Sequence, residues 1–325
     1  MSLELEKQYL HTMFSEQLKQ NYPLADLSTF KIGGNAEYFA ELTTKEEVEA
    51  AFAWAKEQSL PITVLGGGSN ILINDAGVKG LVVRPHNQIL EFSELTCACG
   101  TSIEVKQLAE AAFDKGLSGI EWSIGIPGSV GGAIRGNAGA HGGSFDKVVD
   151  RVIVFDAENF SWHSFAKEEC AFTYRTSRFK LEPHYIIWEI HLSLSAGDIN
   201  TMKQAMDEYR DYRKNSQPKE PSAGCIFKNL FAADVEKQNK DLYEQALADN
   251  KVRGGKIGAG YLVQSLGLKG LSNGGAKISE QHANFIVNAN NASSEDVAVI
   301  IATVKEKVKD QFQIELEEEV QRLGF

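Results

Sequence analysis

The stretch from Gly119 to Gly143 constrains the fold of this chain more than any other part of the sequence. Nine of its 25 residues are glycine, against about 7% in average proteins. Large apolar residues stand between these glycines, which is not the composition of a flexible linker: they are Trp122, Ile124, Ile126, Val130 and Ile134. Because glycine allows close backbone approach and positive φ angles, the pattern indicates one of two things. It is either a wall of backbone amides facing a flat or anionic ligand or a set of tight turns in a compact fold.

A second glycine loop follows the β-like run from Ile62 to Leu65 and reads V-L-G-G-G-S-N from Val64 to Asn70. Consecutive small residues favour backbone amides that cradle a pyrophosphate, so the two loops together indicate a large phosphate-bearing cofactor. Neither loop matches a common nucleotide fingerprint. Ile71 stands where the dinucleotide fingerprint has its third glycine, and no G-x-x-x-x-G-K-[ST] motif occurs. A Rossmann dehydrogenase and a P-loop NTPase are therefore disfavoured.

Composition limits the partners of the chain. Its 325 residues, 43% hydrophobic and 24% charged, are typical of a globular protein with two or three packed units. The formal net charge of −11 argues against sequence-independent binding of nucleic acid. The N-terminus lacks the basic and apolar regions of a signal peptide, and no long apolar run follows. We expect a cytoplasmic protein without a nucleic-acid or membrane partner.

Cysteine and histidine show no metal or disulfide signature. Cys97 and Cys99 are two residues apart, so on a strand both face one side and are expected to be small core residues. The chain contains neither C-x-x-C nor H-E-x-x-H, and a cytosolic protein keeps its thiols reduced. No metal site is predicted.

Periodicity and capping signals predict the elements of secondary structure. Capping boxes at Thr44-x-x-Glu47 and Thr101-x-x-Glu104 predict two helices. Pro218 to Pro221 marks a domain boundary. The other predicted elements are a helical segment over 1–25, a hairpin of 151–155 with 160–165, helices over 197–214, 261–266 and 294–309, and strands over 285–288 and 312–316.

A set of motifs along the chain resembles the UDP-N-acetylenolpyruvoylglucosamine reductase family (the MurB family), flavoenzymes of bacterial cell-wall precursor synthesis. Each motif is weak alone, but their joint occurrence in the family's order is specific. The short connection from Phe179 to Tyr185 resembles the compact second type of this family. The motifs are T-F-x-I-G-G (29–34), V-L-G-G-G-S-N (64–70), G-I-P-G-S-V-G-G-A (125–133), N-A-G-A (137–140), Y-R-x-S-x-F (174–179), P-S-A-G-x-x-F-K-N (221–229) and L-E-x-E-V (316–320).

The resemblance implies an α+β fold with a two-domain FAD-binding unit of the vanillyl-alcohol-oxidase/PCMH type and a third α+β substrate-binding domain. We expect the first FAD-binding subdomain over residues 1–83. The second is expected over 84–216, joined by the C-terminal tail 312–325, and the substrate-binding domain over 217–311. The protein is expected to act as a monomer on a UDP-sugar nucleotide, with non-covalent FAD as cofactor and NADPH as co-substrate.

The resemblance also implies the reaction and its residues. NADPH would reduce the flavin, and flavin N5 would pass hydride to C3 of the enolpyruvyl ether of UDP-N-acetylglucosamine. Cys225 would protonate C2 to give UDP-N-acetylmuramate, while Arg175 and Glu319 would stabilise the enolate. Tyr174 and Asn229 are expected to bind substrate. The expected FAD-binding residues are Leu65, Gly66, Gly67, Gly68, Ser69, Asn70, Ile126, Pro127, Gly128, Ser129, Gly132, Asn137, Ala138 and Gly139.

Three positions depart from the family's usual pattern. Cys225 replaces the usual serine proton donor, and a thiol with an ordinary pKa of about 8.5 is a better acid than an alcohol. Leu230 stands where proline is common and Gln321 where a basic residue is common, which leaves open whether Arg322 makes a flavin or a tail contact.

Each functional residue also has a simpler interpretation. Arg175 can be an arginine of a surface turn, Cys225 a structural thiol, and Glu315 to Glu319 a solvated acidic run. Lys251, Arg253 and Lys256 can hold the UDP diphosphate or belong to an ordinary basic loop.

Two other functions remain open. An oxidase or dehydrogenase of the same flavin-binding architecture would act on another substrate. Many such proteins tether FAD through a histidine in the first glycine loop, where Ser69 and Asn70 stand here. A sugar-nucleotide binding protein without flavin would use the same glycine loops without catalysis.

Overall fold

The computed structural model describes residue 14 and residues 18–325, which form two compact units. Among the described residues, the first unit comprises 14, 18–22, Ala36–Gly67 and Lys79–Arg213, and the second comprises Pro23–Asn35, Gly68–Val78 and Lys214–Phe325. Most of the helix predicted over 1–25 lies outside the described residues, but Lys19–Pro23 form a strand, β1, rather than a helix. The division into three domains remains a prediction.

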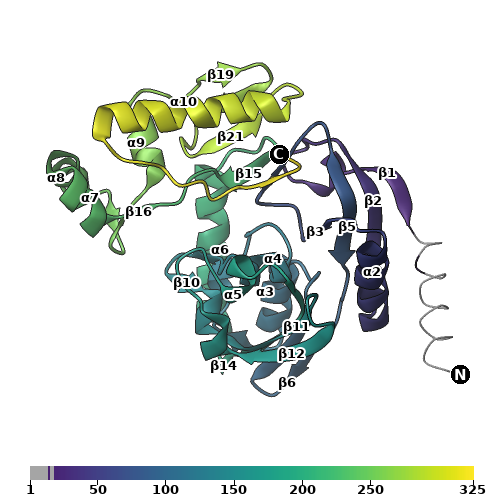
Figure 1. The fold of residues 1–325 in the computed structure, drawn as a ribbon. Coiled ribbons are helices and arrows are strands. Elements are labelled where there is room, and N and C mark those ends of the chain that lie inside the picture. Colours follow the sequence, from purple (N-terminus) through teal and green to yellow (C-terminus); the bar gives the residue numbers. More distant parts are fainter. Residues whose placement is uncertain (1–13, 15–17) are drawn as a thin grey trace, which may run out of the picture. The chain divides into compact units, whose positions relative to one another are not determined.

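The first sheet has the order β1-β2-β5-β3, with α2 beside it (Figure 1). The predicted capping box is confirmed, because the Thr44 hydroxyl accepts from the Glu47 amide and the Glu47 carboxylate accepts from the Thr44 amide. The apolar face of this helix, including Val48 and Phe52, is buried against the sheet. The bounds are β2 Asn35–Leu42, α2 Lys45–Glu57, β3 Ile62–Val64 and β5 Val78–Pro85.

The second sheet of this unit is antiparallel and has the order β12-β11-β13-β7-β6. The predicted hairpin is confirmed, since β11 and β12 pair from Arg151 with Ala166 to Asp156 with Ser161. The bounds are β6 Leu90–Ser93, β7 Thr96–Gly100, β11 Val149–Asp156, β12 Ser161–Ala166 and β13 Tyr185–Ser193.

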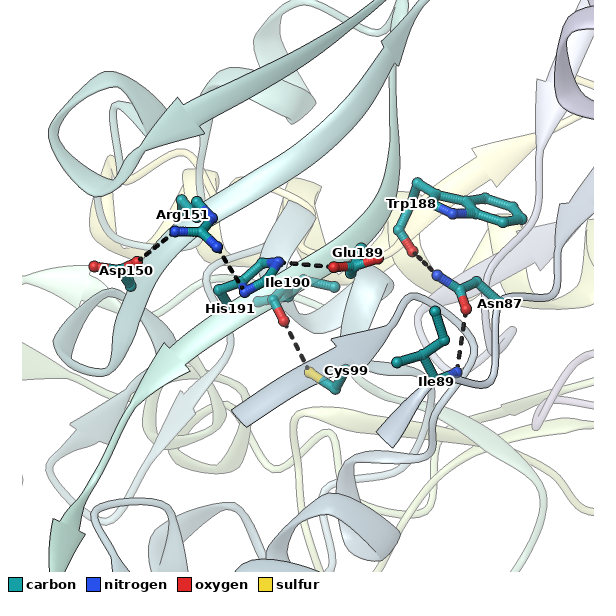
Figure 2. A network of polar contacts seen from close by, with 9 residues as sticks. All are labelled: Asn87, Ile89, Cys99, Asp150, Arg151, Trp188, Glu189, Ile190 and His191. Atoms are coloured by element: carbon teal, nitrogen blue, oxygen red, sulfur yellow. Dashed lines mark hydrogen bonds and ion pairs between the residues drawn. The ribbon is translucent and has the colours of Figure 1, made fainter. Parts of the chain in front are cut away.

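Polar side chains on this sheet are used in structural contacts (Figure 2). His191 lies between Arg151, whose Nη2 is 3.2 Å from Nδ1, and Glu189, whose Oε1 is 2.7 Å from Nε2. Because the guanidinium can only donate, the ring accepts at Nδ1 and donates from Nε2. Asn87 donates to the carbonyl of Trp188 at 3.1 Å. His191 is thus a hydrogen-bonded part of the sheet.

The cysteines of this unit are core residues, as predicted for Cys97 and Cys99. Both are buried on β7, and Cys99 Sγ donates to the Ile190 carbonyl at 3.5 Å. A hydrogen bond with the Cys97 side chain, followed by burial, holds the pKa of the Cys99 thiol well above its usual value. Burial raises the pKa of Cys170 to about 12. The thiols of Cys99 and Cys170 are therefore protonated at neutral pH, and all three cysteines are shielded from solvent.

Helices pack around the second sheet, and one expected cap is wrong. The N-cap of α3 is Glu104, which makes no side-chain capping bond, so Thr101 does not form a capping box. Thr101 instead packs against Gly131, and its carbonyl accepts from the Gly131 amide at 2.9 Å. The α-helices are α3 Val105–Asp114, α4 Val130–Arg135, α5 Arg178–Leu181 and α6 Ile199–Ser216. The short elements are β8 Leu117–Ser118, β9 Gly139–Ala140, β10 Gly143–Ser144, β14 Ser195–Ala196, η2 Glu121–Ser123, η3 Phe145–Lys147 and η4 Lys167–Cys170.

The second unit is built around the sheet β15-β21-β20-β19 and the long helix α10, which lies along this sheet in Figure 1. The Ser293 hydroxyl caps α10 and the Asp296 carboxylate completes a capping box. The predicted apolar face with Val297, Ile301 and Val304 is buried. The bounds are β15 Ser222–Cys225, β19 Ser272–Asn273, β20 Ala276–Ile278, β21 Phe285–Asn288 and α10 Ser294–Phe312.

Smaller elements complete this unit, and two helices in it were not predicted. These are α7 and α8, which bury few large apolar side chains and so give a weak periodic signal. A small sheet has the order β16-β18-β17; in the sequence, β16 precedes α7, and β17 and β18 follow α8. The bounds are η1 Ala25–Leu27, β16 Leu230–Phe231, α7 Ala232–Gln238, α8 Lys240–Ala248, β17 Val252–Arg253, β18 Lys256–Ile257 and α9 Ala259–Ser265.

The strand predicted over 312–316 is wrong. Phe312 ends α10, and Gln313 follows in the left-handed region with φ 58°. Ile314 and Leu316 are buried while Gln313 and Glu315 are exposed, so the alternation reflects burial without strand pairing. The strand lies further on, where β22 (Gln321–Leu323) pairs in parallel with β4 (Ile71–Ile73). None of the helices in the described residues has the length and apolarity needed to cross a membrane.

Candidate functional site

The two glycine loops meet within the first unit at Ser129. The Ser129 hydroxyl accepts from the Gly67 amide at 3.1 Å and from the Gly132 amide at 3.4 Å. A side chain on Gly67 would collide with the backbone of Gly128 and Ser129, and one on Gly66 would press on the Ser129 hydroxyl at 3.2 Å. Glycine is therefore required where the loops touch.

Backbone hydrogen bonds also fix the longer loop to the start of α3. The Val130 amide donates to Ile103 at 2.8 Å, and the Val105 amide donates to Gly128 at 3.0 Å. Gly128 has φ +100°. The glycines thus provide tight turns and close backbone approach, as the second interpretation predicts. A wall of amides facing a ligand stays a prediction. Residues 65–67 and 126–132 contain no acidic side chain, and backbone amides with small hydroxyls suit a pyrophosphate.

The same glycine-rich stretch holds the turn that carries Tyr174 and Arg175. Thr173 and Thr176 form an antiparallel bridge with reciprocal hydrogen bonds of 3.0 and 3.2 Å. Asn137 donates from Nδ2 to the Thr173 carbonyl at 3.0 Å. Its Oδ1 accepts from the Asp146 backbone amide at 3.1 Å, so both ends of this side chain bond to backbone groups.

Arg175 is held in an uncommon conformation. Its φ of +56° lies in the left-handed region, which costs energy for a residue other than glycine. Its Nη1 donates to the Gly139 carbonyl at 3.2 Å, and its guanidinium lies 5.6 Å from the centre of the Tyr174 ring. Lys180 Nζ donates to the Arg175 carbonyl at 3.1 Å. These contacts fix a permanent positive charge beside the glycine stretch.

The end of the first glycine loop belongs to the second unit. Gly68 has φ +66°, and its carbonyl accepts from the Thr29 amide at 3.0 Å. Thr29 also exchanges hydrogen bonds with Ser222, from Oγ1 to the Ser222 carbonyl at 2.7 Å and from the Ser222 amide to the Thr29 carbonyl at 3.1 Å. Thr29 thereby joins the loop to strand β15, which explains why threonine stands there.

Cys225 ends β15 next to a β-bulge. Ser222 pairs with Val287 and Cys225 with Phe285, so β15 has one extra residue between these pairs. Gly224, inside the bulge, has φ +75°. A bulge re-aims the side chain that follows it. Cys225 is partly exposed, in contrast to the three buried cysteines.

The second unit brings the Cys225 segment beside the Glu319 segment. The Glu319 amide donates to the Ile226 carbonyl at 2.7 Å, and Phe227 forms an isolated bridge with Glu318. Asn70 adds a third segment, because its Nδ2 donates to the Glu319 carbonyl at 3.0 Å. Two of the three predicted catalytic residues are therefore on adjacent segments of one unit, while Arg175 belongs to the other unit.

The acidic run before Val320 is ion-paired rather than simply solvated. Glu317 pairs with Lys228, and Glu315 with Lys309 at 2.7 Å. Glu318 accepts from both Lys305 and Arg322. Arg322 therefore makes a contact within the tail.

The expected substrate residue Asn229 is exposed before β16. Its Oδ1 accepts from the Ala259 amide at the start of α9, at 3.3 Å. Arg253 and Lys256 face each other across the β17–β18 hairpin, and Lys251 precedes β17. Across the described part of the chain, no group of three His, Cys, Asp or Glu side chains is placed to hold a metal ion.

One residue of structural importance was not predicted. Asn284 is buried before β21, and its side chain bonds to Phe227. Its signal in the sequence is a polar residue directly before the apolar run F-I-V, in H-A-N-F-I-V-N. That signal alone identifies no partner.

Comparison with known proteins identifies the family of the chain. Residues 36–158 match an FAD binding domain, and residues 217–323 match the C-terminal domain of UDP-N-acetylenolpyruvoylglucosamine reductase. The fold class predicted from the motifs is confirmed: an FAD-binding portion and the family's C-terminal domain, with mixed helices and strands.

Whole-chain relatives carry the same name. The UDP-N-acetylenolpyruvoylglucosamine reductase of Acaryochloris marina is 36% identical over 93% of this chain and 91% of its own. That of Bacillus subtilis is 36% identical over 94% of this chain and 93% of its own. The crystal structure of the Thermus caldophilus enzyme superposes with a TM-score of 0.73 at 32% identity, covering 94% of this chain and 98% of that chain. The chain therefore belongs to the UDP-N-acetylenolpyruvoylglucosamine reductase family.

Proposed function

We propose that this protein catalyses the NADPH-dependent reduction of the enolpyruvyl ether of UDP-N-acetylglucosamine to UDP-N-acetylmuramate, in the cytoplasmic synthesis of peptidoglycan precursors. Family membership over nearly the whole chain supports the reaction class. The observation that carries the proposal is the hydrogen bond of 2.7 Å from the Glu319 amide to the Ile226 carbonyl. It holds the Cys225 and Glu319 segments side by side, and general acid catalysis needs a proton donor held in a fixed position at the reacting centre.

The glycine loops are proposed to hold FAD without a covalent bond. Within the first unit, Leu65 to Gly67 and Ile126 to Gly132 supply closely packed amides and the Ser129 hydroxyl. The remaining proposed FAD-binding residues are Gly68, Ser69, Asn70, Asn137, Ala138 and Gly139. When bound, FAD would take hydride from NADPH and deliver it from N5 to C3 of the enolpyruvyl group.

Arg175 is proposed to stabilise the negative charge that develops on the enolate and carboxylate of the substrate. Its guanidinium stays charged at any physiological pH. The turn around it is fixed by Asn137, Gly139 and Lys180, so little reorganisation is needed when charge develops.

Cys225 is proposed to donate the proton to C2, with Glu319 stabilising the enol. Hydride at C3 and a proton at C2 convert the enolpyruvyl double bond into the lactyl ether, and the thiolate left behind regains its proton from solvent. The bulge at Gly224 directs the thiol, and its partial exposure leaves it reachable by a ligand.

Tyr174 and Asn229 are proposed to position the substrate. Its diphosphate would be held by the basic residues Lys251, Arg253 and Lys256 around the β17–β18 hairpin. Residues 251–256 carry these three positive charges and no acidic residue.

An anaerobic two-step experiment tests the function. The FAD-loaded protein is reduced with NADPH, and the enolpyruvyl ether of UDP-N-acetylglucosamine is then added. We expect the absorbance of oxidised flavin to return with this compound and not with UDP-N-acetylglucosamine, which lacks the double bond. Flavin that stays reduced with the enolpyruvyl compound would overturn the proposal.

A further inference from the structure

Asn284 makes an unusual set of hydrogen bonds for a buried side chain. It is 3% exposed. Its Nδ2 donates to the Phe227 carbonyl at 2.8 Å and its Oδ1 accepts from the Phe227 amide at 3.0 Å. Its backbone carbonyl accepts from the Ile226 amide at 2.8 Å. One residue thus bonds three backbone groups of the segment that follows Cys225: the Ile226 amide and both the amide and the carbonyl of Phe227.

The position of these bonds explains why an amide is needed. Pairing of β15 with β21 ends at Cys225 and Phe285, yet the chain continues through Ile226 and Phe227, which are 0% and 2% exposed. Buried backbone groups need partners. The Asn284 side chain, which both donates and accepts, replaces the strand partner that the Phe227 backbone lacks on the β21 side.

The opposite side of this segment faces the C-terminal tail. The Ile226 carbonyl accepts from the Glu319 amide at 2.7 Å, and the Lys228 amide donates to the Glu317 carbonyl at 2.9 Å. Residues 226–228 therefore lie between Asn284 and the tail. Any shift of residues 226–227 away from Asn284 moves the backbone that joins Cys225 to Glu319.

We propose that Asn284 is a positioning residue that holds Cys225 in register with Glu319. The inference rests on the proposed function, in which these two residues act on the same enolpyruvyl group. Asn284 acts on them through the Ile226–Phe227 backbone.

Asn284 is itself fixed by its surroundings. Its backbone amide donates to His282 Nδ1 at 3.2 Å. A Cβ on Gly260 would come within 3.3 Å of the Asn284 Cβ, so the glycine leaves the space that this side chain occupies. The supports of a catalytic group need such fixed rotamers to hold its geometry.

The decisive variant is Asn284→Ala in the FAD-loaded protein. It removes both side-chain bonds to Phe227 and is expected to slow flavin reoxidation by the enolpyruvyl compound by about a hundredfold, the effect of a small misplacement at a reacting centre. Flavin reduction by NADPH is expected to stay within about twofold of the parent rate, because it uses neither Cys225 nor Glu319. Asn284→Asp keeps the acceptor but turns the donor into an acceptor facing the Phe227 carbonyl, so it should not rescue the rate.

Asn288→Ala is the matched control. Asn288 ends β21, the strand that Asn284 precedes. It also bonds backbone groups, donating to the carbonyls of Phe30 at 3.2 Å and Lys31 at 3.4 Å and accepting from the Ala292 amide at 2.8 Å. Its variant is expected to lower the unfolding temperature while both half-reactions keep their rates. If the enolpyruvyl compound reoxidises the flavin equally fast in Asn284→Ala and Asn288→Ala, Asn284 is only structural and the proposal fails.

Alkylation of Cys225 by iodoacetamide separates this proposal from the proposed function. Cys225 is the partly exposed thiol among four, and its labelling needs no substrate. We expect severalfold faster labelling in Asn284→Ala than in the parent or in Asn288→Ala. Equal labelling in all three would overturn the positioning role. A parent protein that never reoxidises would overturn the function, and the labelling rates would still decide the role of Asn284.

Discussion

The side-chain amide of Asn70 donates a hydrogen bond to the backbone carbonyl of Glu319, 3.0 Å away. The backbone amide of Gln321 donates to the backbone carbonyl of Asn70 at 2.9 Å, next to the parallel pairing of β22 with β4. The end of the first glycine loop and the C-terminal tail are thus one assembly, although 249 positions separate these two residues.

Asn70→Ala is expected to loosen the Glu319 segment. Loss of one partly buried hydrogen bond should lower the free energy of unfolding by about 1 kcal/mol. It should also slow flavin reoxidation by the enolpyruvyl compound, which stopped-flow absorbance measures. Asn74→Ala is the control, because the Asn74 side chain accepts only locally, from Ala76 at 2.9 Å. Equal reoxidation rates in the two variants would contradict the link between Asn70 and Glu319.

Cys225→Ala is expected to separate the two half-reactions. Flavin reduction by NADPH should be unchanged, whereas substrate reduction should fall by about 10²–10⁴-fold, the usual contribution of a general acid. Cys225→Ser restores the hydroxyl usual in the family and should retain much of the second step. Two fast half-reactions in Cys225→Ala would remove this thiol from the mechanism.

Gly224→Ala tests the bulge that directs Cys225. At φ +75°, a Cβ should cost about 1–2 kcal/mol in stability and shift Cys225, slowing reoxidation. Gly267→Ala carries the same backbone strain at φ +67°, and neither glycine has an atom within 4 Å of its would-be Cβ. We expect similar thermal destabilisation in both variants and slow reoxidation only in the first. If the flavin reoxidises slowly in both variants, the slow rate in Gly224→Ala comes from general backbone strain and not from a shift of Cys225.

Ser129→Ala removes the hydroxyl that accepts from both glycine loops. Its two amides, those of Gly67 and Gly132, lose a partner, which should lower stability by about 1–2 kcal/mol. Titration of the apoprotein with FAD should show weaker binding. Thr96→Ala is the control in the same unit, since its hydroxyl donates only to Ser93 in an exposed hairpin, at 2.7 Å. Unchanged FAD affinity in Ser129→Ala would show that the contact does not shape the cofactor site.

His282 predicts a pH dependence of stability. Burial, with a smaller effect of Lys269, lowers the pKa of this imidazole. Its Nδ1 also accepts a hydrogen bond from the backbone amide of Asn284. Because the unfolded chain takes up the proton more readily, stability is fully present above the unfolded pKa of about 6.5 and falls as the pH drops below it. Thermal unfolding at a series of pH values should show this loss, and His282→Gln should reduce it. An unchanged slope in His282→Gln would assign the loss to other groups.

Local sequence signals were sufficient for elements whose stabilising partners are nearby in the chain. The Thr44 capping box, the hairpin of β11 with β12 and the apolar face of α10 were predicted because a few adjacent residues carry each signal. The motif set likewise identified the family. The helices α7 and α8 were missed because a mostly polar surface helix leaves little periodicity.

Signals that depend on a distant partner were ambiguous or misleading. Alternation over 312–316 correctly reported which side chains are buried, but burial does not say whether a second strand is present to pair with. Thr101 and Glu104 have the spacing of a capping box, yet close packing of Thr101 on Gly131 takes the place of the cap. In both cases a tertiary contact decided between local alternatives.

The sequence by itself determined the family, the local elements and the residue types available for chemistry. Only the tertiary structure decided that Ser129 joins two loops across 62 positions, and that Asn284 holds Phe227 across 57. The physical reason is that a hydrogen bond depends on distance and direction in space. Its donor and acceptor carry no mark in the sequence that pairs one with the other.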